Sequence, residues 1–526
     1  MTDRVRPRPS ILAAALIGVL AVAAALTVSH LVAGLIEPAS SPFFAVGNTA
    51  IDHTPEFAKE FAIKHFGSND KNVLLLGMAV VMLVVGLITG LLARIKALFG
   101  IIVVVVLGVV GLLAVQGRPD TSAVGAFSAV VAVVAAVVGV TVLLLLLRAA
   151  PKRAPHSRRR NPESAEPQGD AAEGMSRRGF LGTSAAVAAG AGIAGYGGQL
   201  VLASADPSKV GTIAAAKPLA PLPSGIDFVA DGGLPFTTPN NIFYRVDTSL
   251  QPPQINVNDW QLKIHGMVNK EMTLSFQDLI KRPLIEERIT MTCVSNEVGG
   301  DLVSSADWVG VSLRDLLMEA GVQPGADQIL STASGGYSAG TPLNVVLEPD
   351  RGALLAVNMN GEPLPVIHGF PVRMIVPGIY GFASATKWIT DIELTTFAAK
   401  QAYWIPRGYA AKAPIKTESK ITVPGGFQQV KAGRVTATGT AWMQGVGIKS
   451  VEVMLDSGPW QQARLATEVN KDTWRMWRID LENVPAGSHT LACRATDANG
   501  TLQTQERAST LPDGAAGWHS VLFTAS

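Results

Sequence analysis

The stretch SRRGFLG at residues 176–182 precedes an apolar segment in the middle of a 526-residue chain. Paired arginines ahead of an apolar segment are typical of a signal that directs a folded domain to an export route. A simpler alternative is that Arg177 and Arg178 are only positive charges at the cytoplasmic end of a helix. We interpret the stretch as a twin-arginine signal, which divides the chain into an apolar first half and an exported second half.

The first half is too apolar for a soluble domain. Hydrophobic residues make up 48% of the chain and charged residues 16%, and the mean hydropathy is +0.29. A membrane-spanning helix needs about 20 consecutive apolar residues. Five stretches reach this length, namely residues 11–36, 73–93, 97–115, 123–147 and 181–203. The last is rich in Gly and Ala and has no clear cleavage site after it, so we expect it to remain as an anchor. The sequence therefore predicts an α-helical membrane domain of about five spans.

Loop charges predict the topology. Basic residues gather at the N-terminus, in residues 94–96 and in residues 148–178, whereas residues 37–71 carry five acidic residues against three lysines. Because cytoplasmic loops carry the excess of Lys and Arg, we predict a multi-pass protein of the cytoplasmic membrane with its N-terminus inside. Residues from 205 onward then lie on the extracytoplasmic face. The net charge of +2 follows from this topology and gives no indication of nucleic-acid binding.

Changes in composition predict the domain boundaries. Short apolar runs with helical segments at 275–281 and 312–320 indicate an α+β domain, and regular short strands at 434–442, 451–456, 475–481 and 490–496 indicate a β-sandwich. We predict four membrane helices in 1–150, a cytoplasmic linker in 151–180, a fifth helix in 181–203, a proline-rich extracytoplasmic tether in 204–235, the α+β domain in 236–412 and the sandwich in 413–526.

The chain has two cysteines, Cys293 and Cys493, both in the exported half. A disulfide between them is one possibility in an oxidising compartment, although they fall in different predicted domains. Cys493 alternates with Leu491 and Ala495 on a predicted strand and is most simply a buried small hydrophobe. Cys293 ends the strand-like residues 288–292 before the turn-rich VSNEVGGD, where a thiolate is well placed as a soft metal ligand or a nucleophile.

The sequence around Cys293 resembles the sulfite oxidase family of molybdopterin-dependent oxidoreductases. The matching motifs are TPNNIFYRVDT at 238, MTCVSNEVGG at 291, SSADWVGVSLRDLL at 304, GYSAGTPL at 336, MNGEPLPVIHGFPVRMIVPGIYG at 359 and SATKWI at 384. The tail motifs TATGTAWMQGVGIKSVEV at 436 and TWRMWRIDL at 473 are similar to the family's immunoglobulin-like dimerisation domain, which implies a homodimer. The resemblance covers residues 225–526 and none of the membrane half.

The resemblance implies a molybdenum-molybdopterin cofactor whose single protein thiolate is Cys293, since soft sulfur ligands suit such a metal. Arg373 and His368 would hold the pterin phosphate, and Tyr337 would donate a hydrogen bond to an oxo group or the substrate. The remaining positions implied to line the cofactor are Asn241, Tyr244, Arg245, Ser384, Ala385, Thr386 and Lys387. Without the family, His368, Arg373 and Asn241 would be read as turn residues and Tyr337 as a hairpin aromatic.

Two departures from the family concern the substrate and the electrons. Sulfite oxidases place arginines after the cysteine, whereas here Asn296 is followed by Glu297, whose charge would repel sulfite. The resemblance would place Arg245 near the pocket, but its register is shifted relative to the family's usual arginine. The sequence also contains no CxxCH motif, no cysteine cluster and no dinucleotide fingerprint. An external electron-transfer partner, either a cytochrome or a quinone-linked protein, is therefore implied.

We expect a membrane-anchored, outward-facing molybdopterin oxidoreductase that carries out two-electron oxygen-atom transfer on a small, sulfur-containing substrate. Within enzymes, the alternative is a reductase of methionine sulfoxide or another sulfoxide. From a different class, the alternative is a non-catalytic binding module on a membrane stalk. Retention of Cys293 and of the twin-arginine signal favours the enzyme, because adhesion needs neither.

Overall fold

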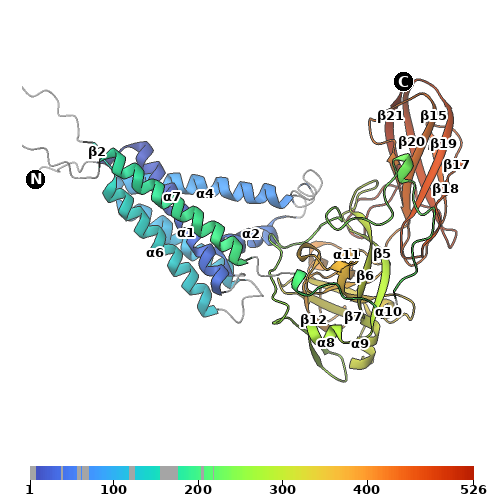
Figure 1. The fold of residues 1–526 in the computed structure, drawn as a ribbon, viewed down its shortest axis with the longest axis horizontal. Helices are drawn as coiled ribbons and strands as arrows, with labels where there is room; N and C mark the ends of the chain where they lie inside the picture. The colour runs from blue at the N-terminus through green and yellow to red at the C-terminus, as the bar shows by residue number, and fades with distance from the viewer. Residues whose placement is uncertain are drawn as a thin grey trace, which may run out of the picture. The chain divides into compact units, whose positions relative to one another are not determined.

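The computed structural model describes residues 8–36, 40–55, 58, 61, 70–117, 125–153, 176–202, 207–216 and 218–526. The chain forms two compact units. The first comprises Met1–Ser204 with Thr248–Gln254, and the second comprises Ala205–Asp247 with Ile255–Ser526. The first unit is helical and the second is rich in strands, as Figure 1 shows.

The helical unit is organised around its first helix. Its helices are α1 (Ile11–Ile36), α2 (Pro42–His53), α4 (Asp70–Ile95), α5 (Ala97–Gln116), α6 (Gly125–Ala149) and α7 (Arg177–Leu202). Helix α1 packs against α4, α6 and α7. Glycines allow the closest approach, because a Cβ at Gly90 of α4 would lie 1.8 Å from the carbonyl oxygen of Ala14 in α1. A short antiparallel pair joins β1 (Arg8–Pro9) to β2 (Lys152–Arg153).

Four helices of the described residues are long and apolar enough to cross a membrane. They are Ile11–Ile36, Lys71–Ile95, Ala97–Gln116 and Ser128–Ala149, which confirms the first four predicted stretches and is compatible with membrane anchoring. The fifth stretch forms α7 but is not among the four, so its role as a span stays a prediction. Helix α2 was not predicted, and most of the predicted linker lies outside the described residues.

The second unit begins with two five-stranded sheets. One has the order β10-β9-β6-β5 with β11 on β9, and the other has the order β4-β3-β12-β7-β8. Their strands are β3 (Gln261–Gly266), β4 (Met272–Ser275), β5 (Leu284–Thr292), β6 (Val303–Ser312), β7 (Gln328–Ala333), β8 (Ser338–Pro342), β9 (Leu354–Met359), β10 (Glu362–Pro363), β11 (Arg373–Ile375) and β12 (Ile389–Thr395). Residues of both sheets share one buried core, which includes Leu262, Val311 and Ile392.

Helices in this region are short, so the predicted α+β domain is mainly β. They are α8 (Phe276–Ile280), α9 (Leu313–Ala320), α10 (Leu343–Val346) and α11 (Gly381–Ser384). The first two match predicted helices, and local sequence explains where they begin. The side chain of Ser275 accepts a hydrogen bond from the Asp278 backbone in a capping box, and Ser312 caps α9 through the backbone of Asp315.

The C-terminal sheet pair consists of two sheets with the orders β13-β15-β19-β18 and β14-β21-β20-β16-β17. Its strands are β13 (Glu418–Val423), β14 (Gln429–Val430), β15 (Gly433–Trp442), β16 (Ile448–Leu455), β17 (Gln461–Gln462), β18 (Arg464–Leu465), β19 (Arg475–Val484), β20 (Gly487–Asp497) and β21 (His519–Ala525). Both sheets bury side chains in one core that contains Trp477, Leu491 and Phe523. All four strands predicted here are present, whereas the immunoglobulin-like class stays a prediction.

The segment predicted to be a tether differs from a free linker. It contains two short 3₁₀ helices, η4 (Pro207–Lys209) and η5 (Val229–Asp231). Its backbone bonds to β5, since the Ala216 N–H donates to the Leu284 carbonyl at 3.0 Å and the Leu219 N–H donates to the Glu286 carboxylate at 2.9 Å. Its apolar residues Val210 and Ile213 pack on the core of the second unit, and this burial holds the segment in place.

Candidate active site

Cys293 lies at the end of β5 and only 6% of it is exposed. A closed loop follows it. The Cys293 N–H donates to the Leu302 carbonyl at 2.9 Å, and the Asn296 N–H donates to the Cys293 carbonyl at 3.0 Å. The Asn296 side chain closes the same loop by accepting from the Leu302 N–H at 2.8 Å. The strand and the loop therefore present the thiol in one fixed place.

The surroundings of the thiol include two predicted tyrosines and a lysine. Burial raises the pKa of the Cys293 thiol, while hydrogen bonds from Ser295 and the charge of Lys387 lower it. Burial also raises the pKa of Tyr244 and of Tyr337, and the nearby Cys293 adds to both shifts. Tyr244, Tyr337 and Lys387 therefore each lie close enough to Cys293 for an electrostatic effect between them.

Tyr337 precedes β8, and its hydroxyl is already engaged. The O–H donates to the Phe382 carbonyl at 2.7 Å, and Trp404 also bonds to it. The ring packs on Tyr403 with a centroid distance of 5.6 Å. The prediction that Tyr337 donates to a bound group therefore requires its proton to leave the Phe382 carbonyl.

Arg373 in β11 is a buried cation, with 4% of the residue exposed. Its Nη1 donates to the His368 carbonyl at 3.0 Å, and its guanidinium lies 5.0 Å from the centre of the Trp308 ring. Its Nε is buried with no hydrogen-bond acceptor among the described residues. Burial lowers the pKa of Arg373 to about 10, so it stays charged at neutral pH. A buried, charged donor without an acceptor is costly, and an anionic ligand would satisfy it.

Two more cations share a single carboxylate beside this arginine. Asp247 accepts from Arg245 Nε at 3.0 Å and from Lys387 Nζ at 2.8 Å. Arg245 Nη2 is buried with no acceptor within the described part of the chain. The charges of Arg245, Arg373 and Lys387 all lower the pKa of His368, which places each of the three cations near His368. The cluster therefore favours an anion.

His368 ends the 3₁₀ helix η6 (Val366–His368) and is 1% exposed. Its Nε2 lies 2.7 Å from the Asn240 carbonyl and donates to it. Burial, together with the cations Arg373, Lys387 and Arg245, lowers the pKa of His368 to about 4, so the ring is neutral at pH 7. His368 therefore fixes the Asn240 backbone rather than carrying charge.

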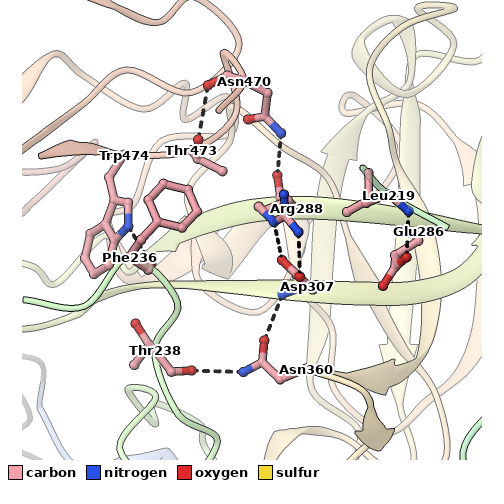
Figure 2. A network of polar contacts seen from close by, with 10 residues as sticks. All are labelled: Leu219, Phe236, Thr238, Glu286, Arg288, Asp307, Asn360, Asn470, Thr473 and Trp474. Atoms are coloured by element: carbon pink, nitrogen blue, oxygen red, sulfur yellow. Dashed lines mark hydrogen bonds and ion pairs between the residues drawn. The ribbon is translucent and has the colours of Figure 1, made fainter. Parts of the chain in front are cut away.

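The segment that contains Asn240 and Tyr244 is held by a polar network between β5 and β6. Arg288 Nε and Nη2 donate to the two carboxylate oxygens of Asp307 at 2.6 and 2.9 Å. The Asp307 N–H donates to the Asn360 side chain, which in turn donates to the Thr238 carbonyl at 2.9 Å (Figure 2). The β5–β6 pair and the loop after Met359 therefore hold the start of the site.

The structure also gives the environment of the other predicted residues. Asn241 is exposed, whereas the neighbouring Asn240 bonds to Met359, Glu362 and Asn360. The Ser384 hydroxyl donates to backbone carbonyls at 2.9 and 3.1 Å, and Thr386 pairs with Ser331. Ala385 follows α11 and extends the same turn. For these positions contact with a cofactor stays a prediction, and the sequence analysis did not identify Asn240 or Asp247.

The structure also gives the environment of Glu297 and of the two cysteines. Glu297 is exposed, and Asn296 is occupied in closing its loop. Cys293 and Cys493 are both free and buried, which excludes the disulfide. Cys493 lies on β20, accepts a hydrogen bond from Ser419 and packs in the C-terminal core, as a small hydrophobe would.

Comparison with known proteins adds a family to this geometry. Residues 249–404 match the family described as "Oxidoreductase molybdopterin binding domain". The mitochondrial sulfite oxidase of Macaca fascicularis is 31% identical over 318 residues, covering 51% of this chain and 57% of that protein. Nitrate reductase [NADH] 1 of Oryza sativa subsp. japonica is 26% identical over 334 residues, covering 52% of this chain and 36% of that protein.

Among solved structures, the sulfane dehydrogenase SoxCD from Paracoccus pantotrophus aligns at 22% identity with a TM-score of 0.48, over 56% of this chain and 84% of that one. This chain aligns with little more than half of the length of the sulfite oxidases that it matches. The family match at residues 249–404 includes Cys293, and the buried donors of Arg373 and Arg245 suit the phosphate of a pterin cofactor. The second unit therefore carries a molybdopterin-binding oxidoreductase domain that is similar to those of sulfite oxidases.

Proposed function

We propose that this protein is a membrane-anchored, molybdenum-dependent oxidoreductase whose active site faces the extracytoplasmic side. The observation that carries the proposal is a buried thiol, Cys293, that feels the charge of Lys387, together with two unsatisfied guanidinium donors on Arg373 and Arg245. When bound, the molybdenum cofactor supplies two-electron oxygen-atom transfer. Cys293 would ligate the metal, and Arg373, Arg245 and Lys387 would hold the phosphate.

Tyr337 would orient the substrate. Its ring is held by Tyr403, and its hydroxyl already donates to the Phe382 carbonyl, so a small rotation of the O–H would redirect the proton toward a bound oxygen.

The substrate class we propose is a small sulfur compound, and two reactions compete. Sulfite oxidation requires closely spaced cations that bind a dianion. Here the position after the cysteine segment is held by the neutral Asn296, which closes its own loop, and the charge of Arg245 is partly neutralised by Asp247. That arrangement favours an uncharged substrate and supports sulfoxide reduction as a second candidate. The electrons would pass to or from an external cytochrome or quinone-linked protein, and a homodimer is the proposed assembly.

Molybdenum content tests the proposal. The full chain is purified in detergent from a host that makes the cofactor, and metal per chain is measured by mass spectrometry. About one metal per chain is expected, as for a single resident site. Cys293→Ser should lose it, whereas Cys493→Ser, the matched control at the other buried free cysteine, should keep it. Metal retained in Cys293→Ser would contradict the assignment.

An assay panel then separates the two reactions. The metal-loaded protein is offered sulfite with an artificial acceptor, and methionine sulfoxide or dimethyl sulfoxide with an artificial donor. Turnover of sulfoxide alone would support the reductase, and turnover of sulfite alone would support the oxidase. A metal-loaded protein that turns over neither would favour the non-catalytic binding module.

A further inference from the structure

The strand that leads into Cys293 is an edge strand whose open edge is covered by the C-terminal sheet pair. Strand β5 lies at the edge of its sheet and pairs with a strand, β6, on one side only. An edge strand presents backbone groups without ladder partners. Here the Arg288 carbonyl accepts from Asn470 Nδ2 at 3.0 Å, and the Thr290 N–H donates to the Asp472 carbonyl at 2.9 Å. Residues outside the cofactor-binding sheets therefore complete β5.

Gln444, in the turn after β15, contacts the residue that precedes Cys293. It is 2% exposed, and its Nε2 donates to the Thr290 carbonyl at 3.0 Å and to Thr292 Oγ1 at 3.1 Å. Thr292 immediately precedes Cys293. The Thr290 hydroxyl accepts from the Trp474 N–H at 2.8 Å, so both ends of this short segment are fixed by the same region.

The sheet pair also holds the chain after Cys293. Lys420 of β13 donates to the Gly300 carbonyl at 3.0 Å and pairs with Asp301. Gly299 has a φ of +82°, and a Cβ there would lie 2.1 Å from the His519 ring of β21. Only glycine permits this approach. The Cys293 loop is thus held by the C-terminal sheet pair both before and after the cysteine.

We propose that Gln444 is a positioning residue that fixes residues 290–292 and thereby the place of the Cys293 sulfur. The proposal rests on the proposed function in one respect, that Cys293 is the metal ligand. The contacts themselves do not depend on a cofactor, so the role of Gln444 can be tested without one. Gln444 touches neither the substrate nor the cofactor in this proposal, and it acts through Thr290 and Thr292.

The first test measures thiol reactivity in full-length protein made in a host that lacks the cofactor. Alkylation of Cys293 by a maleimide is followed by peptide mass spectrometry, with Cys493 as the internal reference. A buried thiol reacts when its surroundings open locally. Gln444→Leu should speed alkylation of Cys293 by about fivefold, the change expected from one net hydrogen bond, and leave Cys493 unchanged.

Two further variants keep the test decisive. Thr292→Val removes one acceptor without altering Gln444 and should give a smaller effect in the same direction. Gln462→Leu is the matched control, because this exposed glutamine of β17 also donates to a backbone carbonyl, that of Val451, at 3.0 Å. Alkylation of Cys293 in Gln462→Leu should equal that of the wild-type protein.

The second test uses the metal-loaded chain and the electron paramagnetic resonance of its one-electron-reduced molybdenum. Gln444→Leu should shift the spectrum, and Gln462→Leu should not. Equal Cys293 alkylation in Gln444→Leu and Gln462→Leu, or equal acceleration of both cysteines, would overturn the positioning role. Metal retained in Cys293→Ser would instead remove the proposed function, whereas the alkylation result would still report on the loop.

Discussion

Arg288 and Asp307 face each other across β5 and β6 and form two parallel hydrogen bonds, Nε to Oδ1 at 2.6 Å and Nη2 to Oδ2 at 2.9 Å (Figure 2). The Arg288 side chain is 9% exposed and that of Asp307 is 22% exposed. The same two residues reach outward, Arg288 through its carbonyl to Asn470 and Asp307 through its N–H to Asn360. This pair therefore connects the segment that contains Asn470 with the loop that contains Asn360.

Removing one partner of this pair should destabilise the second unit. Arg288→Met leaves Asp307 without its bidentate partner, which we expect to cost about 2–4 kcal/mol. The thermal transition of the detergent-solubilised chain should fall by roughly 5 °C or more. Arg434→Met is the control, since the Arg434 side chain is 62% exposed in its pair with Asp480. An equal fall in transition temperature for the two variants would show that the buried pair contributes no more to stability than the exposed pair.

Arg373→Met should separate cofactor binding from folding. The variant removes a buried cation whose Nε has no acceptor among the described residues, so the cofactor-free chain should be as stable as the wild-type protein or more stable. Pterin content after expression with the cofactor should fall by about tenfold or more, as expected when charge-assisted phosphate contacts are lost.

Arg373→Lys provides the graded control, because lysine keeps the charge but not the planar fork. Its pterin content should lie between those of the wild-type protein and Arg373→Met. Normal pterin content in Arg373→Met would remove the arginine from the phosphate site, and a large loss of stability in the cofactor-free variant would assign it a structural role.

Glu418 of β13 should make stability fall with rising pH. Burial raises the pKa of Glu418 to about 8, while Lys416 and Arg507 oppose the shift. The folded state then binds more protons than the unfolded state between the ordinary pKa of about 4.5 and 8, so the stabilisation is complete below that window and is lost as pH rises through it.

Glu418→Gln tests this dependence, because the amide keeps the shape and does not ionise. The transition temperature should fall more steeply between about pH 5 and about pH 9 in the wild-type protein than in Glu418→Gln. This range begins near the lower end of the window and extends beyond its upper end. Parallel profiles would mean that Glu418 is ionised in the folded protein throughout this range.

Local patterns in the sequence were enough for much of the fold. Four membrane-length helices, the four C-terminal strands β15, β16, β19 and β20, and the helices α8 and α9 follow from hydrophobic periodicity, which acts over a few residues. Ordered motifs likewise predict Cys293 and Arg373 as site residues. The bonds that Ala216 and Leu219 make with β5 were not predicted, because the prolines of this segment indicate an extended backbone and do not reveal which distant groups it contacts.

The tertiary structure decided which partners each site residue has. Asp247 joins Arg245, two residues away, to Lys387, 140 residues away, and no local pattern predicts that meeting. Gln444 reaches Thr290 across 154 residues, and the proton of Tyr337 is donated to a backbone carbonyl. The sequence by itself determined which kinds of side chain are available to the site, because a motif specifies residue types. Only folding decided their charge balance and hydrogen bonds, because desolvation and contact depend on segments that are distant along the chain.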